Sequence, residues 1–133
     1  MKNSVVALIF HKDHMENPID IILGVSRKND HNDFGLVGGS VEENETFEEA
    51  IIREVKEETG LDIELKGISG VYSDPDRDPR GHTVTICYKA QKTGGKLRAD
   101  SDAQDVACIK LEEALTYKLA FDHEQILKDA FSI

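Results

Sequence analysis

The chain has few of the features that mark secreted or membrane proteins. Its 133 residues include only two cysteines, Cys87 and Cys108, and both lie in apolar, strand-like runs without the CxxC spacing of a metal or redox site. We therefore expect free thiols and a reducing compartment. No stretch approaches the ~20 apolar residues of a membrane span, and the apolar run after Met1 is too short for a secretory signal. These absences predict a cytoplasmic protein.

Positive charge is also scarce, since Lys and Arg number 16 against 26 Asp and Glu, for a formal net charge of −10. A polyanion needs a basic surface that displaces its counterions, so this balance argues against nucleic acid and anionic membranes as partners. A phosphate-bearing ligand must then be small, and be met by a metal ion or a few local cations. The length and the 39% hydrophobic content predict a single domain over residues 1–133.

Negative charge is concentrated in the stretch Gly39–Leu61, which holds eight glutamates. Thr46 and Glu49 have the spacing of a capping box at a helix start. Gly60 supplies the left-handed residue that commonly ends a helix. The stretch therefore predicts a helix over residues 47–59.

The glutamates of this helix fall into different groups. At about 100° per residue, Glu54 and Glu58 lie in the same sector as the apolar positions, which are Phe47, Ala50, Ile51 and Val55. Glu57 lies at the edge of that sector. Carboxylates spaced three and four residues apart repel one another and are costly to desolvate without a cation. A hard divalent ion bound through oxygen, Mg²⁺ above all, removes that conflict.

These residues carry a resemblance to a known family. Gly39, Glu45 and the run Arg53-Glu54-Val55-Lys56-Glu57-Glu58-Thr59-Gly60-Leu61 resemble the complete Nudix box, with every fixed position filled. The chain departs from the usual pattern at Val37, where the family commonly has proline. The resemblance implies an α/β/α sandwich with a central mixed β-sheet, and hydrolysis of a diphosphate bond.

The resemblance also implies roles for particular residues. The metal ligands would be the Gly39 carbonyl, Glu54, Glu57 and Glu58, with Asp105 reaching the metal from the sheet or remaining a solvated carboxylate. The cofactor would be Mg²⁺, with Mn²⁺ as a substitute. Arg53 would pair with Glu45 and hold the loop to the helix. The general base stays open among Glu57, Glu58 and Asp105, with Glu57 preferred.

The stretch Tyr72–His82 bears on the substrate. It resembles the loop of the ADP-ribose pyrophosphatase branch, in which a proline follows the box at about the distance of Pro75. Two prolines extend this loop, and we expect it to carry Arg77 and Arg80 over the sheet toward a phosphate or carboxylate. Arg27, at a strand end, and Phe34 are the other expected substrate contacts, although Arg27 reads equally well as a solvated edge charge.

The expected reaction is therefore hydrolysis of ADP-ribose to AMP and ribose 5-phosphate. Two alternatives stay open: a (deoxy)nucleoside triphosphate pyrophosphohydrolase, and a module that senses a nucleotide without cleaving it. Homodimer formation also stays open, by analogy with relatives that act on ADP-ribose.

The remaining pattern predicts the other elements. Strands are expected at 4–10, 19–25, 83–90 and 106–111, with one or two strands over 61–72 broken near Gly67 and Gly70, and a glycine turn at 34–39. Residues 92–100 are expected to turn a hairpin between the last two strands. Helices are expected at 112–117 and from Asp122, where a capping box would reach Gln125 and Phe121 would staple to Ile126.

Overall fold

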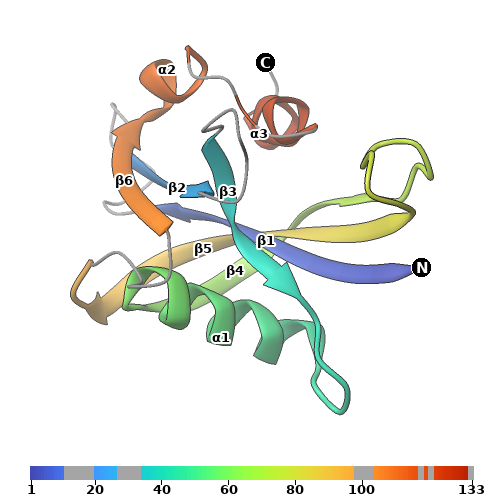
Figure 1. The fold of residues 1–133 in the computed structure, drawn as a ribbon. Coiled ribbons are helices and arrows are strands. Elements are labelled where there is room, and N and C mark those ends of the chain that lie inside the picture. Colours follow the sequence, from blue (N-terminus) through green and yellow to red (C-terminus); the bar gives the residue numbers. More distant parts are fainter. Residues whose placement is uncertain (11–19, 27–33, 98–103, 117–118, 120–121, 132–133) are drawn as a thin grey trace.

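The computed structural model describes residues 1–10, 20–26, 34–97, 104–116, 119 and 122–131 (Figure 1). The strands are β1 (Lys2–Phe10), β2 (Asp20–Ser26), β3 (Phe34–Ser40), β4 (Leu61–Tyr72), β5 (Thr83–Gly95) and β6 (Gln104–Lys110). The helices are α1 (Phe47–Thr59), α2 (Leu111–Ala114) and α3 (His123–Ala130). The strands form one six-stranded sheet in the order β4-β5-β1-β3-β2-β6. Of the described pairings, β1 with β5 is parallel and the others are antiparallel, so the predicted mixed sheet is confirmed.

Helices cover both faces of the sheet, with α1 on one side and α2 and α3 on the other (Figure 1). Strand β1 shows why, because its side chains alternate between two apolar clusters. Val5, Ala7 and Ile9 pack with the buried face of α1. Val6, Leu8 and Phe10 pack with Ile126 and Leu127 of α3. The α/β/α sandwich is thus built on a central strand that is apolar on both faces, as expected for a strand covered on both sides.

The segment that we expected to be a turn is strand β3. Val6 pairs with Gly38 and Val5 with Gly39 in an antiparallel ladder. A Cβ atom on Gly38 would collide with the carbonyl oxygen of Val5 and lie 2.7 Å from the Cα of Val6. The glycine therefore serves close approach of two backbones, not reversal of the chain, which is why the turn prediction was wrong.

Strand β3 changes neighbours along its length. Residues 37–40 pair with β1, whereas residues 34–36 pair with β2. The change occurs because β1 itself pairs with β2 at Ile9 and Phe10. Strand β3 begins on the side of the molecule near α3 and ends on the side near α1 (Figure 1).

The hairpin predicted at residues 92–100 is wrong. Strand β5 continues to Gly95 and pairs with β4 on one edge and with β1 on the other. Both edges of β5 are therefore occupied, and β6 pairs with β2 at the far edge of the sheet. The hairpin in this region joins β4 to β5 through residues 73–82, and β4 has register shifts close to Gly67 and Gly70.

The closing helix begins as expected at Asp122, but the predicted capping box is absent. The Asp122 side chain makes no hydrogen bond to the helix start, because it is engaged elsewhere, as described below. Phe121, the expected staple, lies outside the described residues. Ile126, Leu127 and Leu119 are buried as predicted, and both cysteines are free thiols. None of the described helices is long and apolar enough to cross a membrane.

Candidate functional site

Helix α1 is fixed at both ends by its own sequence. Thr46 Oγ1 accepts from the Glu49 N–H at 3.0 Å and Glu49 Oε1 accepts from the Thr46 N–H at 2.9 Å, so the capping box is confirmed. At the other end Gly60 has a φ of 78°. The Thr59 hydroxyl donates to the Val55 carbonyl at 2.6 Å. These caps, worth about 1 kcal/mol at the N-terminal end alone, set the direction in which the glutamates of the helix point.

Glu54 lies against strand β3 at Gly39. A Cβ atom on Gly39 would lie 2.5 Å from the carboxylate carbon of Glu54, so a glycine is required there for the carboxylate to fit. Burial raises the pKa of Glu54, although Arg53 opposes the shift. A carboxylate taken partly out of water and pressed against a backbone is stabilised by an added cation.

Glu58 and Glu57 differ in their surroundings. Glu58 Oε2 accepts from the Gly38 N–H at 3.0 Å, which ties α1 to β3. The Glu57 side chain, in contrast, is 55% exposed. Within the described part of the chain, no three or more His, Cys, Asp or Glu side chains are gathered in a group that could hold a metal ion. The expected carboxylate cluster is thus brought to one surface of α1 and β3 but is not drawn together.

Arg53 explains that separation. Its Nη1 donates to Glu54 Oε1 at 2.8 Å and to Glu57 Oε2 at 3.2 Å, and lies 3.6 Å from Glu42. The guanidinium therefore neutralises the same carboxylates that a divalent cation would bind. The donor set consists of carboxylate and backbone oxygens, which suits a hard ion such as Mg²⁺, so the residues present fit the predicted metal.

The other edge of Arg53 holds the preceding loop. Nε donates to Glu45 Oε2 at 2.7 Å and Nη2 to Glu45 Oε1 at 3.0 Å, which confirms the predicted pairing. Nη2 also donates to the Ser40 carbonyl at 3.1 Å. Hydrogen bonds from Arg53 lower the pKa of Glu45 to about 2. The pair therefore stays charged at neutral pH, and it joins the end of β3 to α1.

Three predicted site residues are described only in part or not at all. The backbone of Asp105 in β6 pairs with Val25, which in turn pairs with Phe34. These residues form one row across three strands, four positions before Gly38 on β3. The side chains of Asp105 and Phe34, and all of Arg27, lie outside what the structure describes, so their roles stay predictions.

Arg77 lies inside the protein and does not extend over the sheet as expected. Its side chain is 7% exposed. Nε donates to Asp122 Oδ2 at 2.6 Å, Nη2 to Asp122 Oδ1 at 2.7 Å, and Nη1 to Thr85 Oγ1 at 2.7 Å. This network attaches the loop of residues 73–82 to α3, and it is the reason that Asp122 does not cap its own helix.

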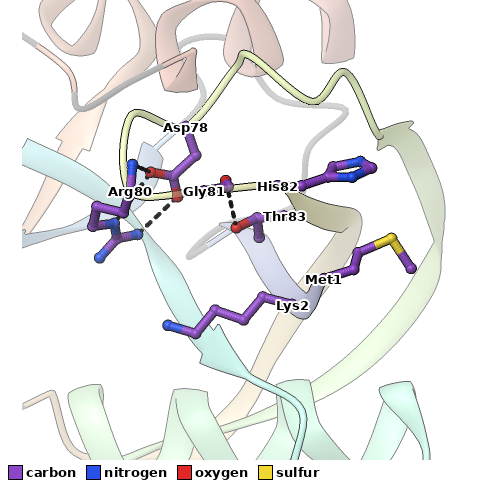
Figure 2. Close-up of a pocket in the computed structure, with 7 residues that line it drawn as sticks. All are labelled: Met1, Lys2, Asp78, Arg80, Gly81, His82 and Thr83. Carbon is purple, nitrogen blue, oxygen red and sulfur yellow. Dashed lines mark hydrogen bonds and ion pairs between the residues drawn. The ribbon is translucent and has the colours of Figure 1, made fainter.

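Arg80 comes from the same loop but lies at the surface, with its side chain 69% exposed. It donates from Nε and Nη2 to the two oxygens of Asp78, at 3.2 and 3.0 Å. Asp78 is buried, and the hydrogen bonds from Arg80 outweigh the effect of burial and lower its pKa. Figure 2 shows Arg80 beside a hollow of about 300 Å³ that is also lined by Lys2 and His82.

His123 is a residue of interest that the sequence did not single out. Its Nδ1 accepts from the Leu36 N–H of β3 at 3.0 Å. Desolvation by burial lowers the pKa of His123 to about 4, which keeps the ring neutral and Nδ1 an acceptor. No local pattern indicates this contact, because the two residues are 87 positions apart.

Comparison with known proteins defines the class. The NUDIX domain model matches residues 1–130, and the chain belongs to this family.

Particular relatives refine this assignment. A protein from Methanocaldococcus jannaschii named ADP-ribose pyrophosphatase is 50% identical over 110 residues, covering 81% of this chain and 64% of that protein. The ADPR responsive transcriptional repressor NtrR of Acinetobacter baylyi is 30% identical over 102 residues, covering 74% of this chain and 41% of the repressor. The NUDIX domain of Shewanella oneidensis NrtR, solved in complex with ADP ribose, aligns with a TM-score of 0.81 at 28% identity, over 99% of this chain and 87% of that one.

The chain is shorter than its curated relatives. It spans 64% of the M. jannaschii protein and 41% of the A. baylyi repressor. The similarity therefore concerns the domain that carries the box.

Proposed function

We propose that this chain hydrolyses the diphosphate bond of ADP-ribose, with Mg²⁺ as cofactor, to give AMP and ribose 5-phosphate. The observation that carries the proposal is the position of Glu54, a partly desolvated carboxylate seated where Gly39 leaves room for it. The substrate assignment is supported by the name of the M. jannaschii relative, at 50% identity.

Glu54, Glu57, Glu58 and the Gly39 carbonyl would hold the ion, and Mn²⁺ would substitute for it. A divalent cation bound there supplies a water of lowered pKa and neutralises charge on the departing phosphate. Arg53, released from Glu54 and Glu57 by the ion, would keep its hold on Glu45 and on the Ser40 carbonyl. The end of β3 would thus stay in place while the carboxylates change partners.

The chain's own groups would handle water and substrate. Glu57 is our preferred general base because its side chain is 55% exposed and so open to water, with Glu58 and Asp105 as the other candidates. Arg80 would bind the phosphate or the terminal ribose, since its planar fork suits such oxygens and it is held at the surface by Asp78. Arg27 and Phe34 are proposed as further substrate contacts.

A second function is a nucleotide sensor that binds ADP-ribose without cleaving it. The similarity to the A. baylyi repressor and to the ADP-ribose complex of S. oneidensis NrtR favours this alternative. The filled Nudix box argues for catalysis, because a sensor has no need of metal-binding carboxylates.

The deciding experiment is a substrate panel with excess Mg²⁺, containing ADP-ribose, other sugar nucleotides, dinucleoside polyphosphates and (deoxy)nucleoside triphosphates, with the products separated and identified. AMP and ribose 5-phosphate from ADP-ribose would support the proposal. Release of pyrophosphate from a (deoxy)nucleoside triphosphate in preference to cleavage of ADP-ribose would support the triphosphate pyrophosphohydrolase alternative. Calorimetric binding of ADP-ribose that is recovered intact would establish the sensor.

A further inference from the structure

The N-cap residue of α3, Asp122, and its first residue, His123, contact two parts of the protein that are far apart in sequence. Asp122 binds Arg77 in the loop of residues 73–82, and the next residue, His123, binds Leu36 in β3. The loop carries Arg80, and β3 carries Gly38 and Gly39 beside the glutamates of α1. Two adjacent side chains therefore join the segment proposed to bind substrate to the segment proposed to bind metal.

The contact with the loop is strong and buried. Asp122 accepts two hydrogen bonds from the guanidinium of Arg77, at 2.6 and 2.7 Å. Such a two-point, charge-assisted pair fixes orientation as well as distance. The Arg77 guanidinium also lies 6.0 Å from the ring of Tyr72, whose hydroxyl donates to Asp129 of α3 at 2.9 Å. The start of the loop and its middle are thus both attached to α3 or to its N-cap residue.

The contact with β3 occurs where the strand changes neighbours. Leu36 is the last residue paired with β2, and Val37 is the first residue in the β1 pairing. The Leu36 N–H donates to Nδ1 of His123 at 3.0 Å, in place of a strand partner. The ring also lies over Gly35, where a Cβ atom would be 3.5 Å from Nδ1. An unpaired N–H in the interior costs about 1–3 kcal/mol, so the hydrogen bond to His123 stabilises β3 at the point where it changes partners.

We propose that Asp122 and His123 are positioning residues, which set the distance and angle between the loop of residues 73–82 and the catalytic strand β3. This inference rests on the proposed function only for the identity of what the two segments bind, which is the substrate for the loop and the metal ion for β3. Movement at Leu36 is transmitted along β3 over two residues to Gly38, whose N–H binds Glu58 at 3.0 Å. Movement at Arg77 is transmitted over three residues to Arg80.

The two side chains should then have separable effects. Loss of the Leu36 contact should lower kcat, because it displaces the strand against which Glu54 and Glu58 rest. Loss of the Arg77 contact should raise KM, because it frees the loop that presents Arg80. A purely structural role would lower the stability of both variants without separating kcat from KM.

The test compares His123→Phe, which keeps a ring but has no acceptor, with His123→Asn, which keeps an acceptor near the position of Nδ1. Asp122→Asn weakens the pair with Arg77, and Glu124→Gln is the control, since Glu124 is exposed on the same turn and pairs with Lys128. Steady-state kinetics and amide hydrogen exchange at Leu36 and Gly38 are measured for each variant. Exchange is read on the protein without substrate or metal, so it needs no activity.

For His123→Phe we expect kcat to fall about tenfold and exchange at Leu36 and Gly38 to quicken, with His123→Asn close to the parent protein. For Asp122→Asn we expect KM to rise about tenfold with kcat nearly unchanged. Unaltered exchange in His123→Phe, or equal losses in His123→Asn and His123→Phe, would overturn the inference. A parent protein that leaves ADP-ribose uncleaved would refute the proposed function, while the exchange data would still decide this inference.

Discussion

Arg53 and Glu45 form a two-point ion pair, from Nε to Oε2 at 2.7 Å and from Nη2 to Oε1 at 3.0 Å. The pair joins the helix that carries the glutamates to the loop that leaves β3. It leaves Nη1 directed at Glu54 and Glu57. One side chain therefore both fixes the backbone of the site and holds its carboxylates.

Glu45→Gln should lower kcat/KM for ADP-ribose by about 10- to 100-fold, the usual effect of removing a partner that orients the groups around a metal. The amide has one acceptor oxygen, and its NH2 group can only donate, so the two-point pair with Arg53 is lost and Arg53 would shift within the site. Arg53→Lys should give a similar loss, because an ammonium lacks the planar fork. Activity within twofold of the parent in both variants would contradict the positioning role.

Glu57→Gln should reduce turnover by about two or more orders of magnitude, the range expected for loss of a general base. The fold should be kept, because the side chain is 55% exposed. Glu64→Gln is a matched control, since Glu64 is 63% exposed on β4, which β5 and β1 separate from β3. Full activity of Glu57→Gln would remove Glu57 from the site.

Gly39→Ala should weaken metal binding and abolish most activity. The new methyl group would lie 2.5 Å from the Glu54 carboxylate carbon, so that carboxylate must move. Gly94→Ala is the control, because its methyl group would meet Asp62 at an ordinary contact distance of 3.5 Å. Calorimetry with Mg²⁺ measures the effect apart from catalysis, and equal Mg²⁺ affinity in the two variants would show that Glu54 is not a ligand.

Arg80→Ala and Arg77→Ala should differ although both arginines belong to one loop. Arg80→Ala should chiefly raise KM, and it should also lower the melting temperature, because it leaves the buried Asp78 carboxylate without its ion-pair partner. Arg77→Ala should lower the free energy of unfolding by about 3–5 kcal/mol, the cost of leaving a buried charge without its partner. Thermal melts and steady-state kinetics of both variants measure these effects. An unchanged KM in Arg80→Ala would show that Arg80 does not bind substrate.

Lowering the pH should lower the free energy of unfolding of the parent protein, because His123 becomes protonated. The pKa of His123 is about 4 in the folded chain, below its ordinary value of 6.5. A lowered histidine pKa means that folding favours the neutral ring. Its stabilising contribution is therefore complete above about pH 6.5 and is lost progressively as the pH falls toward 4.

His123→Asn has no group that titrates in this range, so its free energy of unfolding should depend less steeply on pH. Urea unfolding of both proteins at about pH 7.5 and pH 5 measures the difference, and other titrating groups cancel in the comparison. Equal pH dependence in the two proteins would count against the buried, neutral histidine.

The sequence predicted the local structure of the site well. Helix α1 begins after Thr46 and ends before Gly60 as expected, because each cap binds a residue only three or four positions away in the sequence. The Arg53–Glu45 pair was also expected, from the resemblance to the box. Signals of this kind are short in range and do not depend on how the sheet is assembled.

The sequence did not predict the contacts between side chains that are far apart along the chain. The contact of Arg77 with Asp122 spans 45 positions and that of His123 with Leu36 spans 87. Both contacts depend on the order of the strands in the sheet, and the hairpin prediction placed β6 wrongly in that order. The inward turn of Arg77 follows from the same cause, because Asp122 reaches it only after α3 has packed on the sheet.

At Gly38 the close approach of two backbones alone restricts which amino acid the position can hold. Every alternative amino acid adds at least a Cβ, and the carbonyl oxygen of Val5 already occupies that place. A saturation library at this position should therefore yield no tolerated variant, even when cells are selected for folded protein and not for activity. An invariant glycine at this position would reflect the packing of two strands, and it would be wrong to take it as evidence of a catalytic role.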